Sequence, residues 1–243
     1  MAGEFFRVVA EARELRLTSD EHFTVDGTLI EAWASLKSLR PKGEKPSDRT
    51  PPDDPGNPSV DFHGERRQNA THQSTTDPEA RLAKKGPGKE ARLCYAESVL
   101  MENRNGIMID LRVGQASGRA ECEQGLEMLQ EVRGPRGITV AGDKGYDTAA
   151  FVASCRALNV TPHVAQNERR PGGSALDLRT TSRPGYAVSQ RVRKRVEEIF
   201  GWIKTVGNFR RTRYRGVERT SFAAYLVGAA YNLLRIAKLR PSG

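Results

Sequence analysis

The spacing of apolar residues along the chain predicts that helices and strands alternate. Apolar positions three and four residues apart are typical of amphipathic helices, and they occur over 4–15, 119–132, 149–158, 189–206 and 221–239. Short alternating or continuous apolar runs are typical of strands, and they occur over 21–26, 92–101, 106–113, 138–141 and 161–164. The order strand, hairpin, helix, strand, helix, strand, helix predicts an α/β fold.

Turn and cap residues refine several of these elements. The turn-rich tetrapeptide Asn103–Gly106 predicts a hairpin between the second and third strands. Asp147 or Thr148 is expected to cap the helix that follows them. The first strand is expected to end at Asp26, because a glycine comes next, and residues 30–39 are expected to form a short helix.

Residues 41–91 have a different composition from the rest of the chain. They contain most of the prolines and almost no large apolar side chains. Burial therefore cannot offset the conformational entropy lost on ordering them. We expect a disordered polar insertion after the first strand.

Composition excludes two classes of protein. The three cysteines, Cys94, Cys122 and Cys155, are far apart and odd in number, which excludes a disulfide scaffold and fits a cytoplasmic protein. The longest uncharged run, Thr220–Leu234, is shorter than the roughly 20 residues that span a bilayer, so no membrane association is expected.

Charge is distributed unevenly along the chain. The formal net charge is +9, yet residues 179–243 hold 15 basic and 3 acidic side chains, a net of +12. Such a basic C-terminal part predicts a polyanionic partner. Residues 208–216 interleave aromatic and basic side chains in a pattern suited to nucleic acid, although a basic surface loop is the alternative.

Two aspartates stand at the C-terminal ends of predicted strands, where ligands of an α/β sheet gather. Asp26 follows Val25, and Asp143 follows Gly142. If these strands are neighbours, the two carboxylates can share a divalent cation. The alternative is that each aspartate begins a turn beside a glycine.

A third carboxylate can be sought on the basic helix predicted over 189–206. Successive side chains are arranged around the helix axis at about 100° per residue. Glu197 then falls on a polar strip at the edge of the apolar stripe, in line with Arg193 and Lys204. Glu198 falls on the solvent side, where pairing with a lysine one turn earlier explains it. Glu197 is therefore the candidate ligand, and a surface salt bridge is the alternative.

Three segments in this order resemble the catalytic part of DDE-type insertion-sequence transposases of the group called insertion-sequence family five. They are FTVDGTLIEAW at 23–33, GDKGYD at 142–147 and VEEIFGWIK at 196–204. The resemblance covers nearly the whole chain. It implies a ribonuclease H-like mixed sheet flanked by helices. Residues 1–20 would then be a remnant of an N-terminal region and 21–240 the catalytic domain, including the insertion 41–91 and a basic helical part at 179–240.

The same resemblance implies a site and its partners. Asp26, Asp143 and Glu197 would be the catalytic acids and would hold two Mg²⁺ (or Mn²⁺) ions. The partners would be transposon ends and target DNA, bound by a homodimer associated with the nucleoid. In the family signature, Gln190 replaces a tyrosine. The expected DNA-binding residues are Gln190, Arg193, Lys204, Arg210, Arg211, Arg213 and Arg215.

Two other functions stay open at this point. Members of the group carry a further helical domain before the first aspartate, whereas about 25 residues precede it here. The chain is thus expected to be a partial copy, and a DNA-binding remnant without activity is one alternative. A ribonuclease H-like nuclease, which would share the metal site, is the other.

Overall fold

The computed structural model describes residues 2–43, 61–62, 65–86, 88–132 and 137–240. In this part of the chain, one mixed sheet has the strand order β10-β9-β1-β7-β6, and β8 also pairs with β7. β7 runs antiparallel to β1 and to β8, whereas β9 runs parallel to β1 and to β10. The strands are β1 (His22–Glu31), β6 (Arg81–Ala83), β7 (Arg92–Glu102), β8 (Met108–Gln115), β9 (Ile138–Gly142) and β10 (Val160–Val164).

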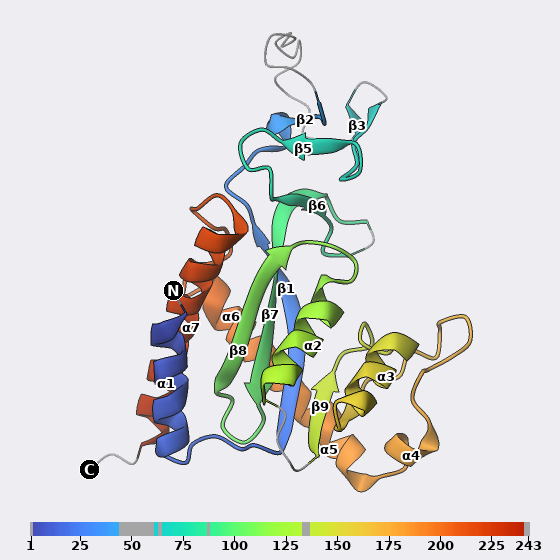
Figure 1. Cartoon of the computed structure of the whole chain (residues 1–243), viewed down its shortest axis with the longest axis vertical. Helices are drawn as coiled ribbons and strands as arrows, with labels where there is room; N and C mark the ends of the chain where they lie inside the picture. Colours follow the sequence, from blue (N-terminus) through green and yellow to red (C-terminus); the bar gives the residue numbers. More distant parts are fainter. Residues whose placement is uncertain (1, 44–60, 63–64, 87, 133–136, 241–243) are drawn as a thin grey trace.

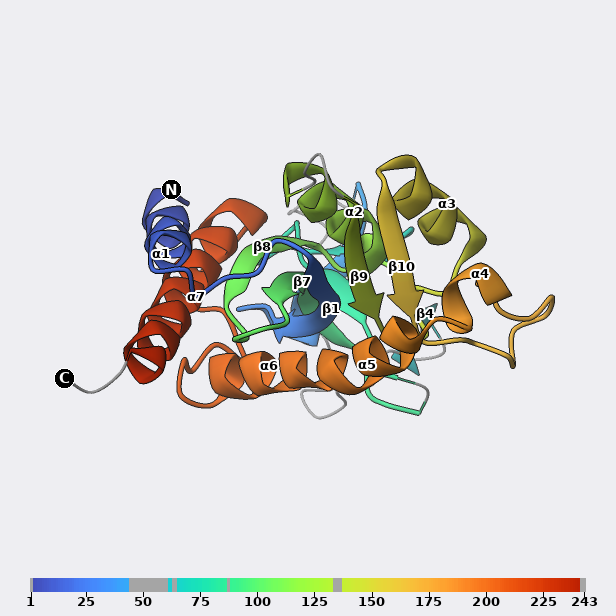
Figure 2. The same cartoon turned by 90° about the horizontal axis from the view of Figure 1, so that it is seen from below.

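Helices cover both faces of the sheet, which confirms the predicted fold class. Figure 2 shows α2 and α3 on one face, and α5 and α6 running across the other. α1 and α7 pack together beside β8 (Figure 1). None of the described helices is long and apolar enough to cross a membrane. The helices are α1 (Gly3–Glu14), η1 (Leu36–Ser38), α2 (Ala120–Val132), α3 (Ala149–Ala157), α4 (Leu178–Thr181), α5 (Pro184–Val192), η3 (Arg193–Arg195), α6 (Val196–Lys204) and α7 (Val217–Leu239).

The core forms where the apolar stripes of these helices meet the sheet. Val196, Ile199 and Ile203 of α6 are buried, as their spacing predicts. α7 is also held by hydrogen bonds to β8. The buried Asn232 side chain accepts from the Met108 N–H at 2.9 Å and donates to its carbonyl at 2.8 Å. Both backbone groups of Met108 are thereby satisfied away from water.

The first strand is longer than predicted. β1 continues through Asp26 to Glu31, pairing with β7 along its length, and the helix expected over residues 30–39 is wrong. Only the short η1 and β2 (Leu39–Pro41) occur there. The physical reason is non-local: Ile30 is buried opposite Tyr95 of β7, a contact that the local pattern does not contain.

Of the insertion predicted over 41–91, residues 44–60, 63–64 and 87 lie outside the described residues. In the remainder of this range, short strands form. β2 pairs with β5 (His72–Ser74), β3 (Asp61–Phe62) pairs with β4 (Glu65–Arg66), and β6 joins the main sheet.

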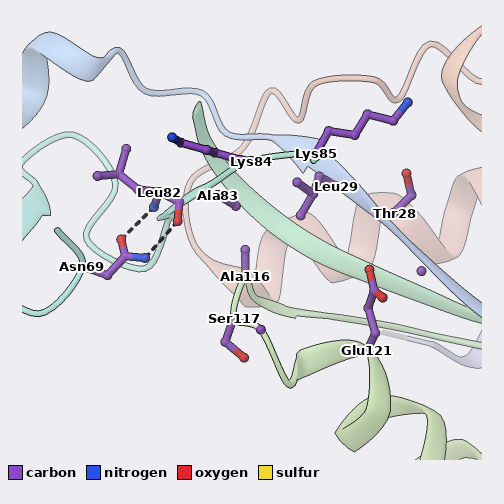
Figure 3. A pocket seen from close by; sticks show the side chains of 12 residues that line it. Thr28, Leu29, Asn69, Leu82, Ala83, Lys84, Lys85, Ala116, Ser117 and Glu121 are labelled. Atoms are coloured by element: carbon purple, nitrogen blue, oxygen red, sulfur yellow. Dashed lines mark hydrogen bonds between the residues drawn. The ribbon is translucent and has the colours of Figure 1, made fainter. Parts of the chain in front are cut away.

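Polar contacts order this insertion where apolar burial is scarce. The Tyr95 hydroxyl donates to the buried Asp77 carboxylate at 2.7 Å. The Asn69 side chain pairs with both backbone groups of Leu82, at 2.8 and 2.9 Å (Figure 3).

Around α3, one of the two expected caps is confirmed. Thr148 caps the helix by accepting from the Phe151 N–H at 3.1 Å. Asp147 is instead fully buried and accepts from the backbone N–H groups of Asn167 and Ala175. It thus fixes the segment that leads from β10 toward α4.

Candidate active site

Two of the predicted acids meet through the register of neighbouring parallel strands. The ladder between β1 and β9 pairs His22 with Thr139 and Thr24 with Ala141, where it ends. If this pairing continued for two further residues, Asp143 would lie opposite Asp26. Repulsion from Asp143 contributes to raising the pKa of Asp26, as expected for two carboxylates that lie close together.

Asp26 faces the side of the sheet that α6 covers. Successive side chains of a strand point to opposite faces. Val25 faces α2. A Cβ atom added to Gly125 of α2 would lie 3.0 Å from Val25 Cγ2. Thr28 meets α6, because Lys204 Nζ donates to its Oγ1. Asp26 therefore shares the α6 face with Thr28.

Burial dominates the electrostatics of this aspartate. It raises the pKa of Asp26 to about 7, and repulsion from Asp143 and Glu121 acts in the same direction. A hydrogen bond from the Gly27 N–H to Asp26 Oδ1, 2.8 Å long, and the charge of Arg193 lower the pKa. A carboxylate with so perturbed a pKa in a half-buried position is typical of a functional site.

The predicted basic strip belongs to the segment from α5 to α6, which runs across one face of the sheet. Gln190 Nε2 donates to the His163 carbonyl at 2.6 Å, at the end of β10. Arg193 Nε donates to Gln190 Oε1 at 3.1 Å. Together with the Lys204 contact to Thr28, these bonds tie the strip to β10 and to β1.

Glu197 lies in the first turn of α6, directly after η3, and its side chain is exposed. Glu198 is exposed too, but its charge raises the pKa of Tyr231 on α7, so it lies on the side of α6 that meets α7. No group of three or more His, Cys, Asp or Glu side chains in the described ranges is arranged to hold a metal ion. The place of Glu197 as a third ligand therefore stays a prediction.

The sequence analysis missed a further acid, Glu121, in the first turn of α2. A Cβ built on Gly27 would lie 2.6 Å from Glu121 Cγ, so this side chain fills the space that the glycine leaves. Figure 3 shows it extending from α2 toward β1, at one end of a pocket of about 450 Å³. The only local signal was a glycine inside a strand, which often marks a close approach.

A second, basic pocket of about 620 Å³ adjoins the first, with Leu29 and Lys85 lining both. Lys204 and Arg210 were predicted to contact DNA, and both line it; Lys85, Lys89 and Arg92 also line it but were not predicted. Positive charge thus gathers beside β1, a few residues beyond Asp26.

The segment 208–216 combines structural and exposed basic side chains. Arg211 lies over the Trp33 ring, 4.8 Å from its centroid, and donates to the Ala32 carbonyl at 3.2 Å. Arg210, Arg213 and Arg215 are exposed. Trp202 packs edge-on against Tyr231 of α7.

The comparison with protein families decides what kind of domain this is. The model of the transposase DDE domain matches residues 19–233, which include Asp26, Asp143 and Glu197. The chain belongs to the DDE transposase family. No curated protein matches it.

This DDE transposase domain is also similar to solved structures of Mos1 transposase. The paired-end complex with the left transposon end shares 11% identity over 66% of this chain and 41% of that chain, with a TM-score of 0.27. The pre-cleavage transpososome shares 12% over 98% and 60%, with a TM-score of 0.28. The strand transfer complex shares 10% over 100% and 62%, with a TM-score of 0.28. The chain therefore spans less than two thirds of each.

DDE transposases generally use divalent metal ions, and the acids of this domain suit them chemically. Carboxylate oxygens are the ligands that Mg²⁺ prefers. Asp26 and Asp143 supply such oxygens side by side at one end of a parallel strand pair. By donor type and position, these two residues fit the metal that the family implies.

Proposed function

We propose that this chain catalyses metal-dependent cleavage of DNA strands and their transfer to a target, at the ends of an insertion sequence of the family five group. One observation supports the proposal: Asp26 and Asp143 lie close enough for their charges to interact, in a domain of the DDE transposase family. The turn interpretation of these aspartates explains neither their juxtaposition nor the raised pKa of Asp26.

Asp26, Asp143 and Glu197 would hold two Mg²⁺ or Mn²⁺ ions. When bound, such a pair activates a water or a DNA 3′-hydroxyl and stabilises the leaving oxygen of an in-line displacement. Cleavage and strand transfer are then the same substitution with different nucleophiles.

The DNA would be held by the basic side chains that flank the acids. Arg193 lies close enough to Asp26 to lower its pKa, and Lys204 reaches β1 at Thr28. Both side chains can hold phosphates next to the scissile bond, and Gln190 would orient Arg193. Arg210, Arg211, Arg213 and Arg215 would extend this contact along the backbone, in a homodimer associated with the nucleoid.

A DNA end with a free 3′-hydroxyl tests this proposal against the two alternatives. The end is built from the DNA that flanks the coding region, and it is incubated with the chain, a supercoiled target and Mg²⁺. We expect products in which the end is joined to the target. Hydrolysis without joining would indicate a nuclease, and binding without either reaction a remnant; both results would contradict the proposal.

A further inference from the structure

The start of α7 is held by two acids of the insertion, which lies far from it in the sequence. The Val217 N–H, the first of the helix, donates to Glu79 Oε2 at 2.8 Å. The Gly216 N–H donates to Asp77 Oδ1 at 3.3 Å. The first N–H groups of a helix have no partner within it, and a carboxylate there also suits the helix dipole. The insertion thus fixes the point at which α7 begins.

The end of β1 holds the segment 208–216, which leads into α7, at a second place. The Glu31 N–H donates to the Arg210 carbonyl at 3.1 Å, and the Thr212 N–H donates to the Glu31 carbonyl at 2.9 Å. These bonds form a parallel bridge between Glu31 and Arg211. The segment is therefore attached to β1 near its beginning and to the insertion at its end.

Two exposed basic side chains lie between these two attachments. Arg213 and Arg215 are both exposed. Among the described residues, neither guanidinium takes part in a hydrogen bond or an ion pair. Their positions therefore depend on the backbone that carries them, and this backbone is fixed by the two attachments.

Gly216 allows the Glu79 carboxylate to approach the backbone closely. Its φ of +87° is a conformation that favours glycine, and a Cβ at this position would lie 2.9 Å from Glu79 Oε2. Glu79 itself is exposed. A negative charge beside a surface that binds phosphates repels them, so its charge alone would oppose DNA binding. The hydrogen bond to Val217 gives this acid a different part to play.

We infer that Glu79 is a positioning residue for DNA binding: by holding the start of α7, it sets the place of Arg213 and Arg215 against the phosphate backbone. The inference rests on the proposed function, in which these arginines contact DNA. It gives the insertion a part in DNA binding that is exerted through the backbone of the segment 208–216.

The salt dependence of DNA binding by the full chain tests the inference, measured by fluorescence anisotropy on a duplex that carries a transposon end. In Glu79→Ala, we expect the slope of log affinity against log salt to fall by about 1 to 2, because up to two phosphate contacts are lost. Removal of a negative charge alone would instead tighten binding. Glu79→Gln keeps an oxygen acceptor for the Val217 N–H and should restore most of the wild-type slope.

A second variant removes the donor and leaves every charge in place. Proline is well tolerated at the first position of a helix, so Val217→Pro deletes the N–H that Glu79 accepts without breaking α7. We expect the same loss of slope as in Glu79→Ala, and no further loss when the two changes are combined. Glu218→Ala is the matched control, because Glu218 is an exposed acid in the first turn of the same helix. It should not lower the slope.

The outcomes separate this inference from the function on which it rests. Wild-type slopes in both Glu79→Ala and Val217→Pro, with Arg213→Ala still lowering the slope, would overturn the role of Glu79 alone. An absence of salt-dependent DNA binding by the wild-type chain would overturn both this role and the proposed function.

Discussion

Asp143 follows β9 and lies close enough to Asp26 of β1 for the two charges to repel, two residues beyond Thr24 and Ala141, the last paired residues of the two strands. The acids are far apart in sequence but become neighbours because their strands are parallel and adjacent. Repulsion between them contributes to the high pKa of Asp26. This juxtaposition supports the proposed metal-dependent chemistry.

The two adjacent glutamates of α6 are expected to behave differently. Glu197→Gln should reduce Mg²⁺-dependent nicking by at least about 10³-fold, because it removes a proposed metal ligand. Glu198→Gln is the matched control, since this side chain lies near Tyr231 of α7. Nicking rates of both variants on one DNA substrate give the comparison. Equal rates in the two variants would contradict the role of Glu197.

A buried carboxylate behind Lys204 predicts a pH-dependent stability. Glu97 of β7 lies opposite Thr28, and burial raises its pKa to about 7, although the charge of Lys204 opposes the shift. Its Oε2 atom is buried without a hydrogen-bond partner in the described structure. Because the folded protein binds this proton more tightly than the unfolded chain, ionisation of Glu97 destabilises the fold as pH rises.

Glu97→Gln should therefore stabilise the protein at high pH. The cost of Glu97 ionisation grows from the unfolded-state pKa of about 4.5 up to the folded-state value near 7. We expect the variant to gain up to about 3 kcal/mol in unfolding free energy at about pH 8 and little at about pH 4. Urea denaturation at both values measures this. An equal gain in unfolding free energy at both pH values would contradict the raised pKa of Glu97.

Local periodicity was sufficient to predict much of the fold and part of the site. The buried face of α6 follows from Val196, Ile199 and Ile203 alone, because helix geometry is local. The same geometry placed Glu198 on the solvent side of this helix, whereas the charge of Glu198 acts on Tyr231 of α7.

The missed features depend on contacts between distant segments. Glu121 lies against Gly27 only because α2 packs on β1, and no spacing within either segment contains that information. The ordered part of the insertion is similar: hydrogen bonds such as that from Tyr95 to Asp77 replace apolar burial. Composition therefore predicted disorder where polar contacts supply the order.

The attachment of α7 should depend on one amide side chain. Asn232→Ala removes both hydrogen bonds to the Met108 backbone and leaves two buried polar groups unpaired. We expect a loss of about 2–4 kcal/mol in unfolding free energy, measured by urea denaturation. Lys238→Ala, at an exposed position of the same helix, should stay within about 0.5 kcal/mol of wild type. A loss of less than about 0.5 kcal/mol in Asn232→Ala would contradict the stabilising role of the Asn232 hydrogen bonds.

The exposed arginines after α6 should set the salt dependence of DNA binding. Arg213→Ala and Arg215→Ala should each lower the slope of log affinity against log salt by about 1, since each removes one phosphate contact. Fluorescence anisotropy over a range of salt concentrations measures the slope. Arg13→Ala, on the surface of α1, is the control. Unchanged slopes in both variants would assign the segment a purely structural role.

Nicking by Asp143→Asn is the most direct test of the central claim that Asp26 and Asp143 form a metal-dependent cleavage site. The variant and the wild-type chain are compared on DNA that carries a transposon end, with Mg²⁺ present, and salt-sensitive binding is measured in parallel. We predict that nicking falls to background while DNA binding is retained. Nicking at the wild-type rate would contradict the account.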